Sequence, residues 1–239
     1  MSPEAAAAIE RADEVFYLVT QPLTAQWIER TNPRSRSLHD LYEPGKPRRQ
    51  TYDEIVEALL APVRAGRSVC AAFYGHPGVF VNPGHEAIRR ARAEGYAARM
   101  QPAISALDCL VADLGIDPAE TGLQSYEATD FVMYRRRPDT AATLVLWQIG
   151  VVGELGYATE PRRESLDLVV DRLAAAYPPG HEVVLYEASP FPLVADPFIE
   201  RLPFEELPAA AVPLLATLVV PPARKPRRDR EAMKRLGLS

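Results

Sequence analysis

Cysteine is scarce in this sequence, and long apolar runs are missing from it. The 239 residues include two cysteines, Cys70 and Cys109, which both lie in apolar stretches. Two separate thiols exclude a disulfide framework and predict buried, reduced side chains, as expected in the cytoplasm. No apolar stretch approaches the ~20 residues of a membrane span. The first residues also lack the basic and apolar regions of a secretory signal, so we expect a cytoplasmic protein.

Positive charges are fewer than negative ones, and the sequence contains no metal-binding pattern. Lys and Arg number 27 against 32 Asp and Glu, which gives a net charge of −5 and a pI near 5.5. This acidic balance argues against general nucleic-acid binding. The sequence has neither a Gly-x-Ser-x-Gly elbow nor a P-loop. No metal site is predicted, because the histidines are scattered and neither cysteine has a partner at ligand spacing; the histidines are His39, His76, His85 and His181.

The composition is that of a globular protein with room for two domains. Hydrophobic residues make up 47% and charged residues 25% of the chain, which is ordinary for a folded protein. The length suits one large or two small domains. Pro102 to Ser105 marks the expected boundary. We therefore predict an N-terminal α/β domain over 1–102, a C-terminal α/β domain over 103–222 and a basic tail over 223–239 that faces solvent or a partner.

Hydrophobic periodicity predicts an alternation of helices and strands. In the first half we expect helices at 3–12, 24–30, 51–63 and 86–94, and strands at 15–19, 69–74 and 97–100. Thr51 is the expected cap of the third helix. In the second half we expect helices at 106–114 and 165–176, and strands at 122–127, 144–149, 181–188 and 216–221. The βαβα order favours a parallel sheet covered by helices.

One strand and the turn after it carry the strongest functional signal. Val69 to Tyr74 is a short apolar run, and Gly75, Pro77 and Gly78 break it immediately afterwards. Ligands of open α/β sheets bind at the carboxyl ends of strands. Glycines there let backbone groups approach a ligand closely. The turn is thus a candidate ligand site, with an ordinary structural turn as the alternative.

The residues of this turn resemble a known family. Tyr-Gly-His-Pro-Gly-Val-Phe-Val-Asn-Pro at 74–83 is similar to the cofactor-binding turn of the tetrapyrrole methylase superfamily, whose usual form is Gly-Asp-Pro. The form with His resembles the borosin peptide-backbone α-N-methyltransferases. Further matching segments lie at 100–106, 113–118, 126–131 and 144–150. The resemblance runs from about Ala6 to the C-terminus.

The resemblance implies a fold and a cofactor. The fold is a two-domain α/β tetrapyrrole-methylase-like fold, with S-adenosyl-L-methionine in a cleft between the domains. The cofactor-binding residues that it implies are Tyr74, Gly75, His76, Pro77, Val79, Phe80, Ser105, Ala106, Gln148 and Ala188. Family members open with a strand and a Gly-x-Gly loop, and this sequence lacks both. Either its start is truncated or misassigned, or another segment fills the slot; we favour a missing start.

A group of tyrosines and one arginine is the candidate catalytic site. By resemblance to the borosin enzymes, Tyr42, Arg48 and Tyr52 form the active site, and Tyr74 adds a further tyrosine. A family tyrosine three residues before Tyr42 is His39 here, which leaves the ordering of the peptide or its residue preference in question. The alternatives are ordinary: Tyr52 can be a core residue, Arg48 a solvated loop charge and Tyr74 a residue that closes the sheet.

The cofactor residues also have ordinary structural alternatives. Ser105 and Ala106 can be only a helix cap, and Gln148, polar within an apolar run, can be a buried hydrogen-bond partner.

The chemistry of amide methylation favours a catalytic role for the tyrosines and Arg48. An amide nitrogen resists methylation because its lone pair is delocalised, so a base must remove its proton. A phenolate beside a guanidinium suits that task, because a nearby positive charge favours ionised tyrosine.

The predicted function is iterative α-N-methylation of backbone amides in a precursor peptide, as in the biosynthesis of ribosomally made, modified peptides. The chain stops at Ser239, soon after its basic segment. We therefore expect a split enzyme that acts on a separate precursor with a leader region. The resemblance also implies a homodimer, or a heterotetramer with the precursor. Two rival functions stay open: a methyltransferase for a small, tetrapyrrole-like molecule, and a non-catalytic binding module.

Overall fold

The computed structural model describes residues 1–43, 45–154, 156, 160–191 and 194–238 of the chain. The chain forms two compact units. Unit 1 contains Met1–Cys109 and Gly156, and unit 2 contains Leu110–Glu154 and the described residues after 159. This grouping does not decide the predicted boundary at residues 102 and 103, which stays a prediction.

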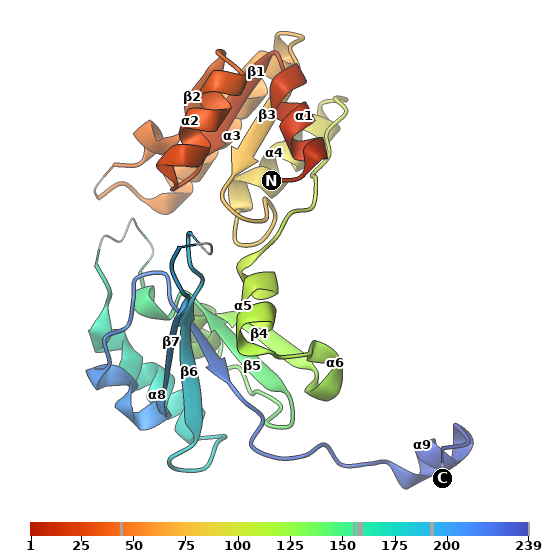
Figure 1. Cartoon of the computed structure of the whole chain (residues 1–239), viewed down its shortest axis with the longest axis vertical. Coiled ribbons are helices and arrows are strands. Elements are labelled where there is room, and N and C mark those ends of the chain that lie inside the picture. Colours follow the sequence, from red (N-terminus) through yellow and green to blue (C-terminus); the bar gives the residue numbers. More distant parts are fainter. Residues whose placement is uncertain (44, 155, 157–159, 192–193, 239) are drawn as a thin grey trace. The chain divides into compact units, whose positions relative to one another are not determined.

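The elements of unit 1 alternate as the sequence predicts (Figure 1). They are α1 (Pro3–Arg11), β1 (Glu14–Leu18), α2 (Pro22–Thr31), β2 (Ser35–Ser37), the 3₁₀ helix η1 (His39–Leu41), α3 (Arg48–Arg64), β3 (Val69–Phe73) and α4 (Asn82–Ala93). Helix α5 (Ala106–Leu114) follows a long irregular segment.

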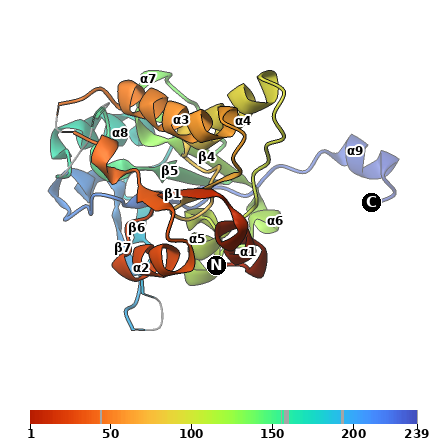
Figure 2. The same cartoon turned by 90° about the horizontal axis from the view of Figure 1, so that it is seen from above.

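The sheet of unit 1 is parallel, with the order β2-β1-β3 among the described residues. Strand β1 is buried on both faces. Phe16 faces a cluster with α3 and α4 residues such as Ile55 and Ala87, whereas Val15 and Tyr17 face a cluster with Ile28 of α2. Figure 2 shows α3 and α4 on one face of this sheet and α1 and α2 on the other. Burial of both faces explains the continuous apolar run in β1.

Unit 2 has a mixed sheet with the order β4-β5-β8-β6-β7 in the described chain. Its strands and helices are α6 (Pro118–Thr121), β4 (Leu123–Glu127), α7 (Ala128–Met133), β5 (Thr143–Trp147), η2 (Ile149–Val151), η3 (Arg163–Ser165), α8 (Leu166–Ala174), β6 (Glu182–Glu187), β7 (Phe198–Pro203), η4 (Phe204–Ala209), β8 (Thr217–Val220) and α9 (Arg230–Arg235). Strands β4 and β5 are parallel, and the other pairs are antiparallel.

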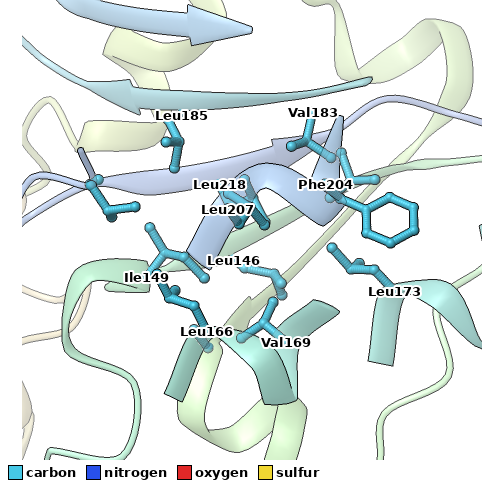
Figure 3. Packing of buried hydrophobic residues seen from close by; sticks show 14 of the residues in the cluster. Leu146, Ile149, Leu166, Val169, Leu173, Val183, Leu185, Phe204, Leu207 and Leu218 are labelled. Carbon is cyan, nitrogen blue, oxygen red and sulfur yellow. The ribbon is translucent and has the colours of Figure 1, made fainter. Parts of the chain in front are cut away.

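The core of unit 2 is packed between its sheet and α8. Figure 3 shows Leu146 of β5, Leu166 and Val169 of α8 and Leu185 of β6 in one cluster. These side chains are almost fully buried. The apolar periodicity at residues 165–176 predicts this helix and its buried face correctly.

Two sequence predictions about local structure are wrong. Residues 97–100 are irregular backbone in the described chain, not a strand; the Ala98 carbonyl instead accepts a hydrogen bond from the side chain of Arg92 at 2.8 Å. Thr51 does not cap α3, because that helix begins at Arg48 and Thr51 is buried inside it. Strand β7 was not predicted, because half of its side chains are exposed and its sequence lacks an apolar run.

Candidate active site

The turn after β3 carries the predicted cofactor-binding residues from Tyr74 to Phe80, and two histidines hold it. The N–H of Gly78 donates to Nδ1 of His76 at 3.0 Å. Nε2 of His85, in the first turn of α4, lies 2.8 Å from the Gly78 carbonyl oxygen. The next N–H, that of Val79, donates to the His76 carbonyl oxygen at 3.2 Å. Hydrogen bonds on both sides of Gly78 fix the path of the backbone through the turn.

This turn contains strained backbone and exposed aromatic rings. Gly75 has a φ of +66°, which favours glycine, and Phe80 has a φ of +58°. A non-glycine residue in this region is uncommon, and such strain gathers at ligand sites. The side chains of Tyr74 and Phe80 are 48% and 47% exposed. The two rings leave apolar surface at both ends of the turn that a ligand could cover.

Two further glycines serve the packing of the turn. A side chain at Gly78 would begin 2.5 Å from the Met100 sulfur and 3.1 Å from Nε2 of His85. A side chain at Gly84, in α4, would begin 2.9 Å from the Pro77 carbonyl oxygen. The space beside Gly78 is therefore taken by the protein itself. The sequence prediction assigned this glycine to close approach of a ligand, and the structure gives it a different reason.

Ser105 and Ala106 lie at the start of α5, where Ser105 bonds to a carboxylate. The backbone N–H and the hydroxyl of Ser105 both donate to Oδ2 of Asp108, each at 2.6 Å. The hydrogen bonds from the Ser105 side chain and backbone hold the pKa of Asp108 below its usual range, and the nearby His76 adds a smaller contribution. Ser105 Oγ also accepts a hydrogen bond from the backbone N–H of Asp108 at 3.4 Å, so Ser105 caps the start of α5, and its contact with the cofactor stays a prediction. The segment also lies near the turn, because a side chain at Gly75 would begin 3.7 Å from the Ile104 carbonyl oxygen.

The end of β1 brings two predicted regions of unit 1 together. The Leu18 carbonyl oxygen accepts a hydrogen bond from the N–H of Tyr74 at 2.9 Å. The next carbonyl oxygen, that of Val19, lies 2.9 Å from Nε2 of His39. Tyr74, which precedes the turn, and η1, which precedes Tyr42, therefore meet at consecutive residues. This is the carboxyl edge of a parallel sheet, where ligands bind in open α/β folds.

The candidate residues Tyr42, Arg48 and Tyr52 lie on η1 and the first turns of α3. Tyr42 follows η1, and its N–H donates to the His39 carbonyl oxygen at 3.0 Å. Arg48 and Tyr52 are four residues apart on α3, so they share one face of the helix. Both tyrosine rings are half-buried and pack against the apolar cluster of α3 and α4. The core alternative for Tyr52 therefore accounts for part of its ring, and Tyr42 packs against the same cluster.

Arg48 is not a solvated loop charge, as one sequence alternative had it. It is the first residue of α3 and is half-buried. Its guanidinium donates from Nε at 3.2 Å and from a terminal nitrogen at 2.8 Å to the carbonyl oxygen of Gly156 in unit 1. A guanidinium at this position can therefore bind a peptide carbonyl oxygen through two of its N–H groups.

Unit 2 carries the remaining predicted cofactor residues at one edge of its sheet. Gln148 follows β5 with a φ of +60°, and Ala188 follows β6. Both strands are antiparallel to β8, which lies between them, so their carboxyl ends share one edge. The polar side chain predicted inside a strand thus lies just past its end, in strained backbone. The predicted cleft between the two domains stays a prediction.

Sequence reasoning did not single out several residues that the structure places around these positions. Asp108 could have been found, because Ser-x-x-Asp is a capping pattern at a helix start. His85 could not, because its bond to Gly78 depends on how α4 packs against the turn. No cluster of three or more His, Cys, Asp or Glu side chains suited to a metal ion occurs among the described residues. No described helix is long and apolar enough to span a bilayer.

Comparisons with known proteins point to one family. The profile of the family described as Tetrapyrrole (Corrin/Porphyrin) Methylases matches residues 1–192. A protein of Coprinopsis marcescibilis, named a methyltransferase/ribosomally synthesized type I borosin cyclic peptide precursor, is 40% identical over 249 residues and aligns with 100% of this chain. The corresponding omphalotin A precursor of Omphalotus olearius is 39% identical over 243 residues, again with 100% of the chain aligned. This chain spans 63% and 58% of the lengths of these relatives.

Solved structures share the fold. The uroporphyrin-III C-methyltransferase of Thermus thermophilus, in complex with S-adenosylhomocysteine, superposes with a TM-score of 0.62 at 17% identity. The superposition covers 92% of this chain and 90% of the Thermus chain. Cobalt precorrin-4 methyltransferase gives a TM-score of 0.62 at 16% identity, with coverage of 95% and 90%. At these identities the likeness shows the fold alone. The predicted α/β methylase fold is confirmed.

Proposed function

Because the chain belongs to the tetrapyrrole methylase family, we propose that it is an S-adenosylmethionine-dependent methyltransferase that methylates backbone amide nitrogens of a precursor peptide. The family predicted from the Gly-His-Pro turn is confirmed. The observation that carries the peptide substrate is the similarity to the borosin proteins, at about 40% identity along the chain. Their names join a methyltransferase with a cyclic peptide precursor.

The cofactor is supported by the turn of unit 1. Exposed Tyr74 and Phe80 offer apolar surface, and the rigid, strained backbone between them offers polar groups in fixed positions. These features fit a molecule with an aromatic base, a sugar and an amino acid. The related fold in Thermus thermophilus was solved with S-adenosylhomocysteine. When bound, S-adenosylmethionine supplies an electrophilic methyl group on a sulfonium sulfur.

The protein's part in the reaction is to prepare the amide. A tyrosine phenolate takes the proton from the amide nitrogen, and general-base help of this kind is worth roughly 10²–10⁴ in rate. The Arg48 guanidinium, which already binds a backbone carbonyl, stabilises the negative charge that then develops on the substrate carbonyl oxygen. Tyr42 and Tyr52 are the candidate bases.

The precursor and the assembly are further parts of the proposal. We expect a peptide with a leader region that reaches this chain as a separate molecule, and a homodimer of the enzyme. The rival functions predict different substrates: a tetrapyrrole-like small molecule for one, and binding without turnover for the other. The borosin similarity favours the peptide, because the tyrosine and arginine set is not needed for a tetrapyrrole substrate.

The experiment incubates the purified chain with S-adenosylmethionine and one of two peptides. The first peptide is the precursor portion of the Omphalotus olearius relative, and the second is a short protein encoded beside this gene. Mass spectrometry counts the added CH₂ units, and fragmentation places them on backbone nitrogens or on side chains. A parallel reaction offers a tetrapyrrole precursor. Methylation of the tetrapyrrole alone, or saturable binding of S-adenosylhomocysteine without any turnover, would replace the peptide proposal with one of its rivals.

Two conservative variants test the proposed roles. Tyr52→Phe removes the hydroxyl and keeps the ring, so turnover should fall by roughly 10²–10⁴ while S-adenosylhomocysteine binding persists. Arg48→Lys should also impair turnover, because an ammonium cannot reproduce a planar guanidinium. Tyr42→Phe is measured alongside to identify the base. The matched controls are Tyr96→Phe, whose ring packs against the same cluster, and Arg49→Lys on the exposed side of α3; both should leave turnover unchanged.

A further inference from the structure

Lys46 is an unusually enclosed lysine in the loop before α3. Its side chain is 10% exposed, whereas lysine is among the side chains least often buried. The ammonium donates to the Leu41 carbonyl oxygen at 2.9 Å and to Oε2 of Glu54, and Oε1 of Glu43 lies 4.0 Å away. An enclosed charge of this kind persists where its donors find acceptors.

The contacts of Lys46 join three segments of unit 1. Leu41 is the last residue of η1, Lys46 lies in the loop, and Glu54 is on the second turn of α3. Glu54 also accepts a hydrogen bond from the side chain of Gln50 at 3.0 Å, so both of its oxygens are engaged. The bonds from Lys46 and Gln50 hold the pKa of Glu54 below its usual range. The carboxylate is therefore ionised at neutral pH and can keep this link.

Three of the four candidate catalytic residues, all except Tyr74, lie close in sequence to an anchor of this link. Tyr42 directly follows Leu41, Arg48 is two residues after Lys46, and Tyr52 lies between Gln50 and Glu54. Among the described residues, the start of α3 has no side-chain cap, because its N-cap residue is Pro47. Helix starts without a cap are less stable. The bonds of Lys46 thus hold the start of α3 and the loop before it in place, where no capping side chain does so.

We propose that Lys46 is a positioning residue, which holds Tyr42, Arg48 and Tyr52 in one arrangement through its bonds to Leu41 and Glu54. This inference rests on the proposed function of those three residues. Its action is indirect, because the ammonium is bound to protein groups, the Leu41 carbonyl oxygen and the Glu54 carboxylate. Loss of the link lets η1 and the start of α3 move independently. A displacement of about 1 Å at reacting groups can reduce turnover by roughly 10².

The test uses Lys46→Met, which keeps the length and apolar stem of the side chain and removes its donors. The matched control is Arg64→Met at the far end of the same helix, which breaks bonds to Glu57 and Glu94. Each protein is assayed for turnover and KM with the Omphalotus olearius precursor peptide and S-adenosylmethionine. Hydrogen exchange of residues 41–54 and calorimetry with S-adenosylhomocysteine need no substrate and are measured on the same samples.

We expect Lys46→Met to lower kcat by about 10–100-fold, with KM and S-adenosylhomocysteine affinity within about twofold of the wild type. Exchange should be faster at residues 41–54 only. Glu54→Gln should give a smaller loss of the same kind, and adding it to Lys46→Met should cause little further loss, since both changes break one link. Arg64→Met should keep the wild-type kcat.

The outcomes separate this inference from the proposed function. A wild-type kcat in Lys46→Met, or unchanged exchange at residues 41–54, overturns the positioning role and leaves the proposed function intact. A parallel loss of cofactor affinity would mean general damage to unit 1, which also overturns it. If the wild-type protein methylates no peptide, the proposed function fails, and the role of Lys46 in it fails too.

Discussion

A single methyl group at Gly84 should disturb the turn after β3, which we assign to the cofactor, from outside that turn. Gly84 lies in the first turn of α4, and a side chain there would begin 2.9 Å from the carbonyl oxygen of Pro77. Ordinary non-bonded contacts of a carbon atom lie near 3.5 Å or beyond. The carbonyl belongs to the backbone and cannot rotate away, so in Gly84→Ala the turn or the helix must shift by about 0.5 Å.

The size of the effect follows from opposing contributions. Replacing glycine by alanine in a helix stabilises it by at most about 1 kcal/mol, whereas overpacking costs about 1–3 kcal/mol. The free energy of unfolding of unit 1 should therefore fall by about 0–2 kcal/mol. The shift also strains the two hydrogen bonds of Gly78, from its N–H to Nδ1 of His76 and between its carbonyl oxygen and Nε2 of His85, each worth about 1 kcal/mol. Losing the equivalent of one such bond at the turn weakens S-adenosylhomocysteine binding by about fivefold.

Titration calorimetry with S-adenosylhomocysteine measures this loss, and thermal unfolding measures the stability. Arg89→Ala is the control on the same helix, because Arg89 is exposed and pairs only with Glu86 in the described contacts. It should leave the affinity unchanged. An affinity of Gly84→Ala within twofold of the wild type would refute the reasoning, since it would mean that the turn does not hold the cofactor or that the contact with Pro77 relaxes without consequence.

Two further predictions concern single positions. Gly150→Ala should lower the free energy of unfolding of unit 2 by about 3 kcal/mol, because the new carbon meets the backbone carbonyl oxygens of Pro213 and Leu214; urea unfolding checks this, and a stability equal to the wild type would contradict it. Asp108→Asn should be less stable than the wild type at pH 7. Because the pKa of Asp108 is lowered in the folded protein, the stabilisation is present above about pH 4 and disappears as the pH falls through the lowered pKa. The difference in stability between Asp108→Asn and the wild type should therefore shrink at low pH, and an equal difference at pH 7 and pH 3 would contradict the assignment.

The sequence predicts those elements whose own residues determine them. Apolar periodicity locates α8 and β5, and the glycines and proline at 75–78 locate the turn after β3. Prediction from the sequence fails where a neighbouring segment of the chain determines the structure. Residues 97–100 have some strand character but no neighbouring strand among the described residues. Strand β7, by contrast, has only one buried side chain and forms because β6 offers it a long ladder of hydrogen bonds.

The candidate site divides in the same way. Tyr42, Arg48, Tyr52 and Tyr74 are candidates because their spacing resembles that of the borosin enzymes, and their roles stay predictions. The residues that hold them are not recognisable from the sequence, because their contacts depend on packing. His85 reaches Gly78 only because α4 lies against the turn, and Lys46 reaches Glu54 only because the loop folds back on α3. A lysine beside other basic residues looks solvated in the sequence, yet its side chain is 10% exposed.

Two separate sets of bonds therefore support the two tasks of unit 1. The histidines at Gly78 fix the turn that we assign to the cofactor, and Lys46 fixes the segment that we assign to the peptide. The two regions meet at the end of β1, where Leu18 binds Tyr74 and Val19 binds His39. Because β1 is buried on both faces and pairs with β2 and β3, both regions are anchored on one buried central strand. Changes at Gly84 should therefore act on cofactor affinity and changes at Lys46 on turnover, since each set of bonds is attached to the strand independently.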